Sequence, residues 1–241
     1  MPGLGTIINA AAILLGGIIG LLFGRLLSAQ HQDTLNKACG ICVLFIAIAG
    51  TMEGMLAIDG ASIASGRSLL IIACIVPGAL IGETLNLENL FETFGKWLKV
   101  KTGNAKDKQF VEGFVTASLT VCIGAMAIIG AIQDGLLGDY SLLVTKAVLD
   151  FIIILIMTCS LGRGCMFSAI PVAIVQGTVT VLSGLIKPLM TDAALANLSI
   201  VGSILIFCVG LNLVWGKQIR VANMLPAILI AVGIAFLPFT I

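Results

Sequence analysis

The sequence has little charge and few aromatic side chains. Of its 241 residues only 10% are charged and 6% are aromatic, with a single histidine and a single tyrosine. A soluble domain usually has about 25% charged residues, so this deficit places the chain among membrane proteins. Because the formal net charge is only +1, we expect no nucleic-acid partner.

The side chains that catalysis usually needs are also scarce. His31 lies in a predicted loop, and the sequence contains no HExxH or GxSxG string. The run Gly138-Asp139-Tyr140 does not supply the helical aspartate pair of an intramembrane protease. We therefore predict that the protein is not an enzyme and needs no cofactor.

The cysteines do not form a metal-binding pattern. Cys39-Gly40-Ile41-Cys42 has the spacing of a redox or zinc motif, but no second CxxC follows. All seven cysteines lie in or at the edge of apolar runs, where cysteine behaves as a small hydrophobic residue. We interpret them as packing residues and expect no metal site.

Long apolar runs fill most of the chain, whose residues are 59% hydrophobic. A membrane-spanning helix needs about 20 apolar residues. The runs predict an all-α, polytopic transmembrane bundle of about eight spans, forming a single integral membrane domain over 1–241. The first run lacks a basic flank and a cleavage site, so we interpret it as a retained helix. The spans are expected at 4–24, 35–56, 67–84, 113–133, 141–161, 165–186, 198–215 and 221–239.

Prolines interrupt three of these spans, and two of the breaks resemble each other. The string around Pro77 in the third span is similar to the string around Pro226 in the eighth, and Pro171 lies in the sixth. The pairing implies an inverted repeat of spans 1–3 and 6–8, with units 1–85 and 165–241. Inverted repeats with paired broken helices are typical of transporters.

The lysines and arginines predict the orientation. If the connection after the third span is cytoplasmic, ten of them lie inside, only Arg67 and Lys187 lie outside, and Lys146 is within the membrane. This asymmetry favours eight spans over seven, with both termini outside the cytoplasmic (inner) membrane of a bacterium. The ten are Arg25, Lys37, Lys96, Lys99, Lys101, Lys106, Lys108, Arg163, Lys217 and Arg220.

The one long connection, about 86–101, has an amphipathic pattern. Apolar residues including Phe94 and Trp97 recur at helical spacing, and Glu88, Glu92 and Lys96 occupy the other face. Such a helix lies on the cytoplasmic membrane interface. Its alternative role is to bind a partner.

Two charges lie inside the fifth span. Lys146 and Asp150 are four residues apart, so their side chains leave the same face of a helix. Each would cost about 2.5–3.5 kcal/mol at the centre of a spanning helix. Asp150 cannot reach either surface, so a salt bridge to Lys146 or protonation is its cheapest solution. The pair either lines a polar path or only fixes helix register.

Six further polar residues are candidates for a solute or ion pathway. Two carboxylates at outer helix ends form either a cation-attracting vestibule or ordinary interfacial charge. Two deep amides either hold helices together or line the path. Two residues near the cytoplasmic ends of the broken helices are candidates for a gate. These pairs are Glu53 and Asp134, Asn9 and Gln176, and Glu83 and Asn223.

Four motifs together resemble a known family. The strings at 5–10, 78–83, 135–151 and 223–227 resemble the YqgA/YdfK family of bacterial polytopic inner-membrane proteins. That family has a domain of unknown function and is sometimes labelled a transport protein, so the resemblance implies location and fold more than activity. It also implies that six residues occupy motif positions. They are Asn9, Glu83, Lys146, Asp150, Asn223 and Pro226.

Two functions follow from these patterns. The first is a secondary transporter or channel for a small solute or ion, with Lys146 and Asp150 as the central charged site. The alternative is a structural or sensory membrane protein whose charged pair fixes packing. The partners expected are the lipid bilayer and the transported solute. A homo-oligomer is permitted by the stripe of Gly16, Gly20 and Gly24 but is not required.

Overall fold

A computed structural model describes residues 2–59 and 62–236, and this part of the chain is almost entirely helical. A small antiparallel hairpin pairs Leu56 with Ser65 and Asp59 with Ser62. The elements are α1 (Leu4–Gly24), α2 (Ala29–Met55), β1 (Leu56–Asp59), β2 (Ser62–Ser65), α3 (Ser68–Leu85), α4 (Leu87–Lys101), α5 (Phe110–Cys122), α6 (Ala125–Leu137), α7 (Ser141–Leu161), η1 (Arg163–Ser168), α8 (Ala169–Val181), α9 (Ser183–Ile186), η2 (Lys187–Leu189), α10 (Asp192–Trp215), η3 (Val221–Met224) and α11 (Pro226–Ile234).

The predicted all-α bundle is confirmed, with differences in two of the eight expected spans. Six helices are long and apolar enough to cross a membrane, counting η1 and α8 together. The expected span 113–133 is instead two helices, α5 and α6, bent by 63°, which make a seventh if they count as one. The eighth is a shorter apolar segment, Val221–Ile234, and the end of its expected range, 237–239, lies outside the described residues.

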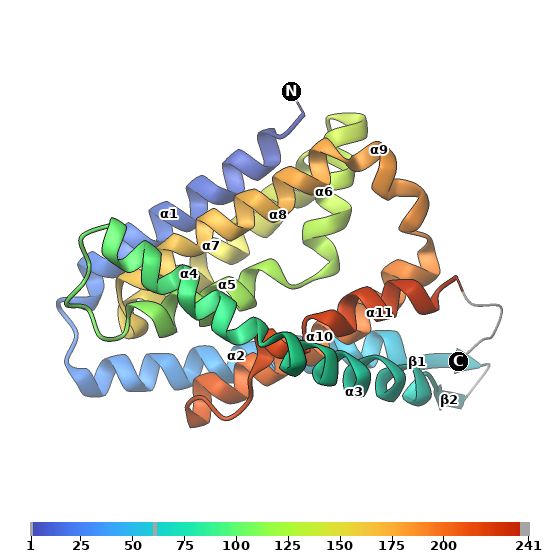
Figure 1. Cartoon of the computed structure of the whole chain (residues 1–241), viewed down its shortest axis with the longest axis horizontal. Helices are drawn as coiled ribbons and strands as arrows, with labels where there is room; N and C mark the ends of the chain where they lie inside the picture. The colour runs from blue at the N-terminus through green and yellow to red at the C-terminus, as the bar shows by residue number, and fades with distance from the viewer. Residues whose placement is uncertain (1, 60–61, 237–241) are drawn as a thin grey trace.

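The helices form two groups, visible in Figure 1. Helices α1, α7 and α8 lie together on one side of the molecule, and α2, α3, α10 and α11 lie together on the other. Helix α5 packs against both α7 and α10 and therefore lies between the two groups. The largest core cluster has buried side chains from both groups, including Ile13, Phe114 and Leu205.

Glycine allows helices α1 and α7 to pack closely. A Cβ added to Gly16 would lie 2.5 Å from the carbonyl oxygen of Phe151, and one added to Gly20 would lie 2.5 Å from that of Leu155. Helices α1 and α7 therefore approach backbone to backbone. This arrangement is typical of membrane bundles, where association depends on close packing.

The proline in the third span does not interrupt it. Helix α3 runs unbroken through Pro77, because neighbouring groups in a bundle can compensate for a lost helical hydrogen bond. The following residue, Gly78, packs against the backbone of Ala227 in α11, and Gly82 packs against Asn223 in η3. The two proline-containing segments that resemble each other in sequence are thus in direct contact.

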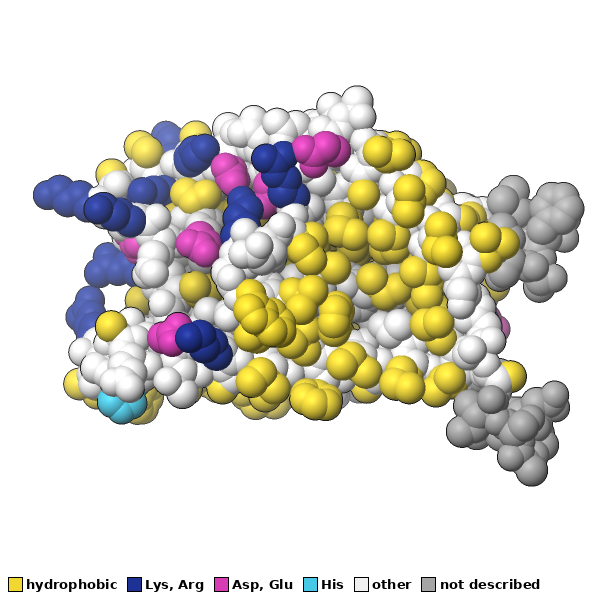
Figure 2. Space-filling view, turned by 90° about the horizontal axis from the view of Figure 1, so that it is seen from below, with side chains coloured by type: hydrophobic (Ala, Val, Ile, Leu, Met, Phe, Trp, Pro, Cys, Tyr) yellow, Lys and Arg dark blue, Asp and Glu magenta, His cyan; other side chains and the backbone are white. Residues whose placement is uncertain are grey.

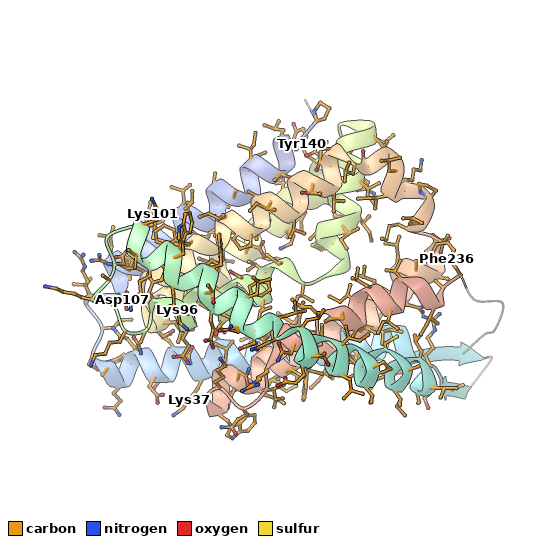
Figure 3. All side chains as sticks on the ribbon, viewed as in Figure 1. Lys37, Lys96, Lys101, Asp107, Tyr140 and Phe236 are labelled. Atoms are coloured by element: carbon orange, nitrogen blue, oxygen red, sulfur yellow. The ribbon has the colours of Figure 1, made fainter. Side chains whose placement is uncertain are left out.

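The surface has one charged end and a broad apolar region. In Figure 2 lysine and arginine side chains gather at one end of the molecule, and hydrophobic side chains cover much of the rest of the visible face. Figure 3 places Lys37, Lys96 and Lys101 at this basic end and Phe236 at the opposite end. The distribution matches a membrane-embedded body with one basic, solvent-facing end.

Candidate functional site

The predicted pair is formed and buried inside the bundle. The ammonium of Lys146 donates to Asp150 Oδ2 at 2.5 Å. The two side chains are only 8% and 5% exposed. Both come from the face of α7 that also buries Leu143, Ala147 and Ile154. The ion pair within one helix therefore offsets part of the cost of burying the two charges.

Lys146 also contacts the break between α5 and α6. Its ammonium donates to the carbonyl oxygen of Val121 at 2.9 Å, one residue before α5 ends at Cys122. Carbonyls in the last turn of a helix lack an intrahelical donor and carry a partial negative charge. Gly124 forms the break with φ 148° and ψ 145°, a conformation that is essentially limited to glycine.

Both predicted amides are buried, and one of them lies beside the charged pair. Asn9 of α1 neighbours the Asp150 carboxylate, and Gln176 of α8 is 1% exposed. The neighbour of the Asn9 amide is thus the Asp150 carboxylate, whereas the Gln176 amide has no hydrogen-bond partner within the described part of the chain. Buried polar atoms without a partner are rare in folded proteins. Five more side chains of α1, α5, α6, α7 and α8 have such atoms: Thr6, Ser118, Asp134, Thr158 and Thr180.

Asp134 is buried, but its contact is with the start of a helix. Its Oδ2 accepts a hydrogen bond from the backbone N–H of Gly5 at 3.0 Å, so it caps the N-terminus of α1, where a negative charge is favourable. Glu53 is exposed on α2. No hydrogen bond or ion pair among the described residues joins the two carboxylates, so the predicted vestibule has no direct contact between its members.

Glu83 and Asn223 are brought together at the basic end. The Asn223 amide donates to Glu83 Oε2, and its oxygen accepts from the backbone N–H of Glu88 at 2.7 Å. Arg220 pairs with the other oxygen of Glu83 at 2.6 Å. Asn86, between α3 and α4, has a positive φ of 50°. The cluster therefore joins the turn from α3 into α4 to the segment before α11.

Helix α4 is also tied to the bundle by Lys217. This lysine pairs with Glu88 at 2.9 Å and with Glu92 at 2.8 Å. The hydrogen bond from Lys217 lowers the pKa of the Glu92 carboxyl. Burial alone would lower the pKa of Lys217, but its hydrogen bonds to Glu92 and Glu88 raise it. The polar face of α4 thus contacts protein as well as solvent.

A cavity of about 660 Å³ opens at the basic end. Its walls include Lys96 and Lys99 of α4 and Lys37 of α2, and its apolar lining includes Leu119 of α5 and Val209 of α10. Helix α5 continues from Leu119, in the cavity wall, to the break that Lys146 contacts. The cavity and the charged pair are therefore both in contact with α5.

The Val121 carbonyl and the side chains of Glu88 and Lys217 were not predicted as site groups from the sequence. The Val121 carbonyl is a backbone group, which no residue pattern singles out. The sequence marks Glu88 only as a residue of the polar helix face and Lys217 only as one of the charges that predict orientation. The signal that could have found Glu88 is its position on the amphipathic face, one residue after the α3–α4 turn.

The cysteines do not gather into a site. All seven are free thiols, and no group of three His, Cys, Asp or Glu residues suited to a metal ion occurs within the described ranges.

Comparison with known proteins places the chain in one family. A family model described as "Protein of unknown function (DUF554)" matches residues 4–236. The chain is 32% identical over 236 residues to the uncharacterized protein YqgA of Escherichia coli (strain K12), covering 96% of each protein. It is 30% identical over 232 residues to the uncharacterized membrane protein YdfK of Bacillus subtilis (strain 168), covering 96% of this chain and 95% of the relative. No solved structure matches.

Proposed function

The chain belongs to the family of unknown function DUF554, and we propose that this multi-pass membrane protein is a secondary transporter or channel rather than an enzyme. Its cargo is a small solute or ion. The observation that supports this proposal is the position of the Lys146–Asp150 pair against a broken span, at 2.9 Å from the Val121 carbonyl. Discontinuous helices in transporters place their free ends at the substrate site.

Two buried polar side chains of the bundle add to this support. Asn9 is buried beside the Asp150 carboxylate, and Gln176 is buried with both amide atoms unpaired in the described structure. A structural ion pair needs no such neighbours, whereas a hydrated or solute-binding path does. Within the proposal, Asp134 lies at the outer end of the path, Glu53 attracts ions at the outer surface, and Glu83 with Asn223 gates the cytoplasmic end.

We also infer the orientation and internal symmetry. The basic end faces the cytoplasm across a bacterial inner membrane, with both termini outside. The inverted repeat pairs α1 with α8, α2 with α10 and α3 with α11. It is supported by direct packing within each of these three pairs.

The test uses purified protein reconstituted into liposomes. Uptake of labelled sodium, rubidium, L-lactate and L-alanine is measured, together with proton flux reported by a trapped pH-sensitive dye. At least one flux should exceed that of empty liposomes, and Asp150→Asn should abolish it. Asp192→Asn, an exposed carboxylate at the start of α10, is the matched control and should leave flux unchanged. Full flux in Asp150→Asn would remove Asp150 from the mechanism.

One observation favours the second candidate function, a non-transporting membrane protein. The pair is nearly sealed from solvent, at 8% and 5% exposure, as expected of a device that fixes helix register. If none of the five fluxes exceeds that of empty liposomes, this second role is the better account.

A further inference from the structure

The break between α5 and α6 presents two helix ends of opposite polarity. Helix α5 ends in free carbonyls, one of which, on Val121, already accepts a hydrogen bond from an ammonium group. Helix α6 begins at Ala125 with no side-chain cap and no acidic residue in its first turn. Its N–H groups therefore carry an uncompensated partial positive charge.

The start of α6 lies at the depth of the charged pair. A Cβ added to Gly130 would lie 2.8 Å from Leu143 Cδ2, which fixes the register of α6 against α7. The two helices are joined by the short connection 138–140 and therefore run antiparallel. One turn before Gly130 on α6 thus faces one turn after Leu143 on α7, which is the level of Lys146.

Four groups consequently meet at one depth, two of each polarity. The acceptors are the Val121 carbonyl and the Asp150 carboxylate. The donors are the Lys146 ammonium and the first N–H groups of α6. Beside Asp150, Asn9 is fully buried, and its side chain interacts with the Asp150 carboxylate.

From this arrangement we infer, building on the transport function proposed above, that the solute is a small zwitterion of the α-amino acid class. Its ammonium takes the place of the Lys146 ammonium at the Val121 carbonyl and Asp150. Its carboxylate binds Lys146 and the N-terminus of α6, and Asn9 supplies a further hydrogen bond. Every charge in the occupied site then has an opposite charge beside it.

Ligands with a single charge fit the site less well. A cation would separate Lys146 from Asp150 and leave two positive charges for one carboxylate. An anion would leave Asp150 beside a second negative charge. In a buried site such an uncompensated charge is strongly unfavourable. A zwitterion divides the existing pair without changing the net charge.

The test compares three ligands of similar size that differ in charge. Binding of labelled L-alanine to the purified protein in detergent is measured. Unlabelled L-alanine, L-lactate, ethylamine and sodium chloride are then compared as competitors for this binding. L-Alanine should bind, and L-lactate, which lacks the ammonium, and ethylamine, which lacks the carboxylate, should each compete at least tenfold more weakly. Asp150→Asn and Lys146→Met should each abolish binding, whereas the exposed-site control Lys106→Met should not.

The outcomes separate this inference from the transport function. Flux of another probe that depends on Asp150, without L-alanine binding, overturns the zwitterion and leaves the transporter. Equal competition by L-lactate or ethylamine also overturns it. Absence of any flux that depends on Asp150 removes both proposals. If Asp150→Asn does not elute as a single species on gel filtration, the neutral double variant Lys146→Met with Asp150→Asn replaces it and should likewise fail to bind.

Discussion

At the scale of single residues, Lys146 and Asp150 stabilise each other only while both are present. They form an ion pair inside one helix, with 8% and 5% of the side chains exposed. Removing one partner of a buried pair leaves an uncompensated charge and costs about 3–5 kcal/mol. Replacing both with apolar residues is often neutral or stabilising.

This asymmetry gives a prediction that separates stability from transport. Lys146→Leu alone should lower the free energy of unfolding by about 3–5 kcal/mol, measured as a lower apparent melting temperature in detergent. The double variant Lys146→Leu with Asp150→Leu should melt close to the parent protein. It should nevertheless show no flux in liposomes, whereas a purely structural pair would leave every activity of the double variant intact.

The pair was predictable from the sequence because its geometry is local. A spacing of four residues places two side chains on one helix face whatever surrounds them. The contacts of Lys146 with Val121 and of Asp150 with Asn9 depend on how α7 packs against α5 and α1, which the spacing does not encode. Hydropathy indicates that Asn9 is buried but gives no partner for it.

At the scale of elements, the main difference from expectation is the break in the span 113–133. The run is apolar throughout, and hydropathy does not register a change of direction. The only local signal is Gly124, whose φ of 148° requires glycine. The predicted interruption at Pro77 was wrong in the opposite sense, because α3 continues through this residue. In a bundle, the neighbouring helices decide whether proline or glycine bends a span.

The glycines of α1 provide a prediction at this scale. A Cβ on Gly20 would lie 2.5 Å from the Leu155 carbonyl oxygen, so Gly20→Ala must push α1 away from α7. We expect a loss of about 1–3 kcal/mol in stability, the usual cost of overpacking, seen as a lower melting temperature in detergent.

Gly177 of α8 is the matched control, since no described atom lies within 4 Å of a Cβ added there. Gly177→Ala should be neutral, or stabilising by up to about 1 kcal/mol through the higher helix propensity of alanine. Equal melting temperatures for Gly20→Ala and Gly177→Ala would show that the α1–α7 contact does not limit stability.

At the scale of the whole molecule, the number of crossings depends on the last helix. The basic end holds Arg220, which pairs with Glu83, and η3 and α11 lead away from it (Figure 1). The segment Val221–Ile234 rises about 20 Å at 1.5 Å per residue. The hydrocarbon core is about 30 Å thick. A full eighth crossing therefore needs either the residues after Ile234 or a locally thinner bilayer.

Reporter fusions distinguish eight crossings from seven. Alkaline phosphatase, which is active only outside the cytoplasm, should be active when fused after Ser65 and after Ile241. Green fluorescent protein, which fluoresces only if it stays in the cytoplasm, should be fluorescent after Asn104, beside the basic connection, and dark at the other two sites. The reason is the concentration of lysine and arginine at one end of the bundle, which sets orientation. A fluorescent fusion after Ile241 together with an active phosphatase after Ser65 would mean that α11 does not cross, and that the two proposed repeat units are unequal in span.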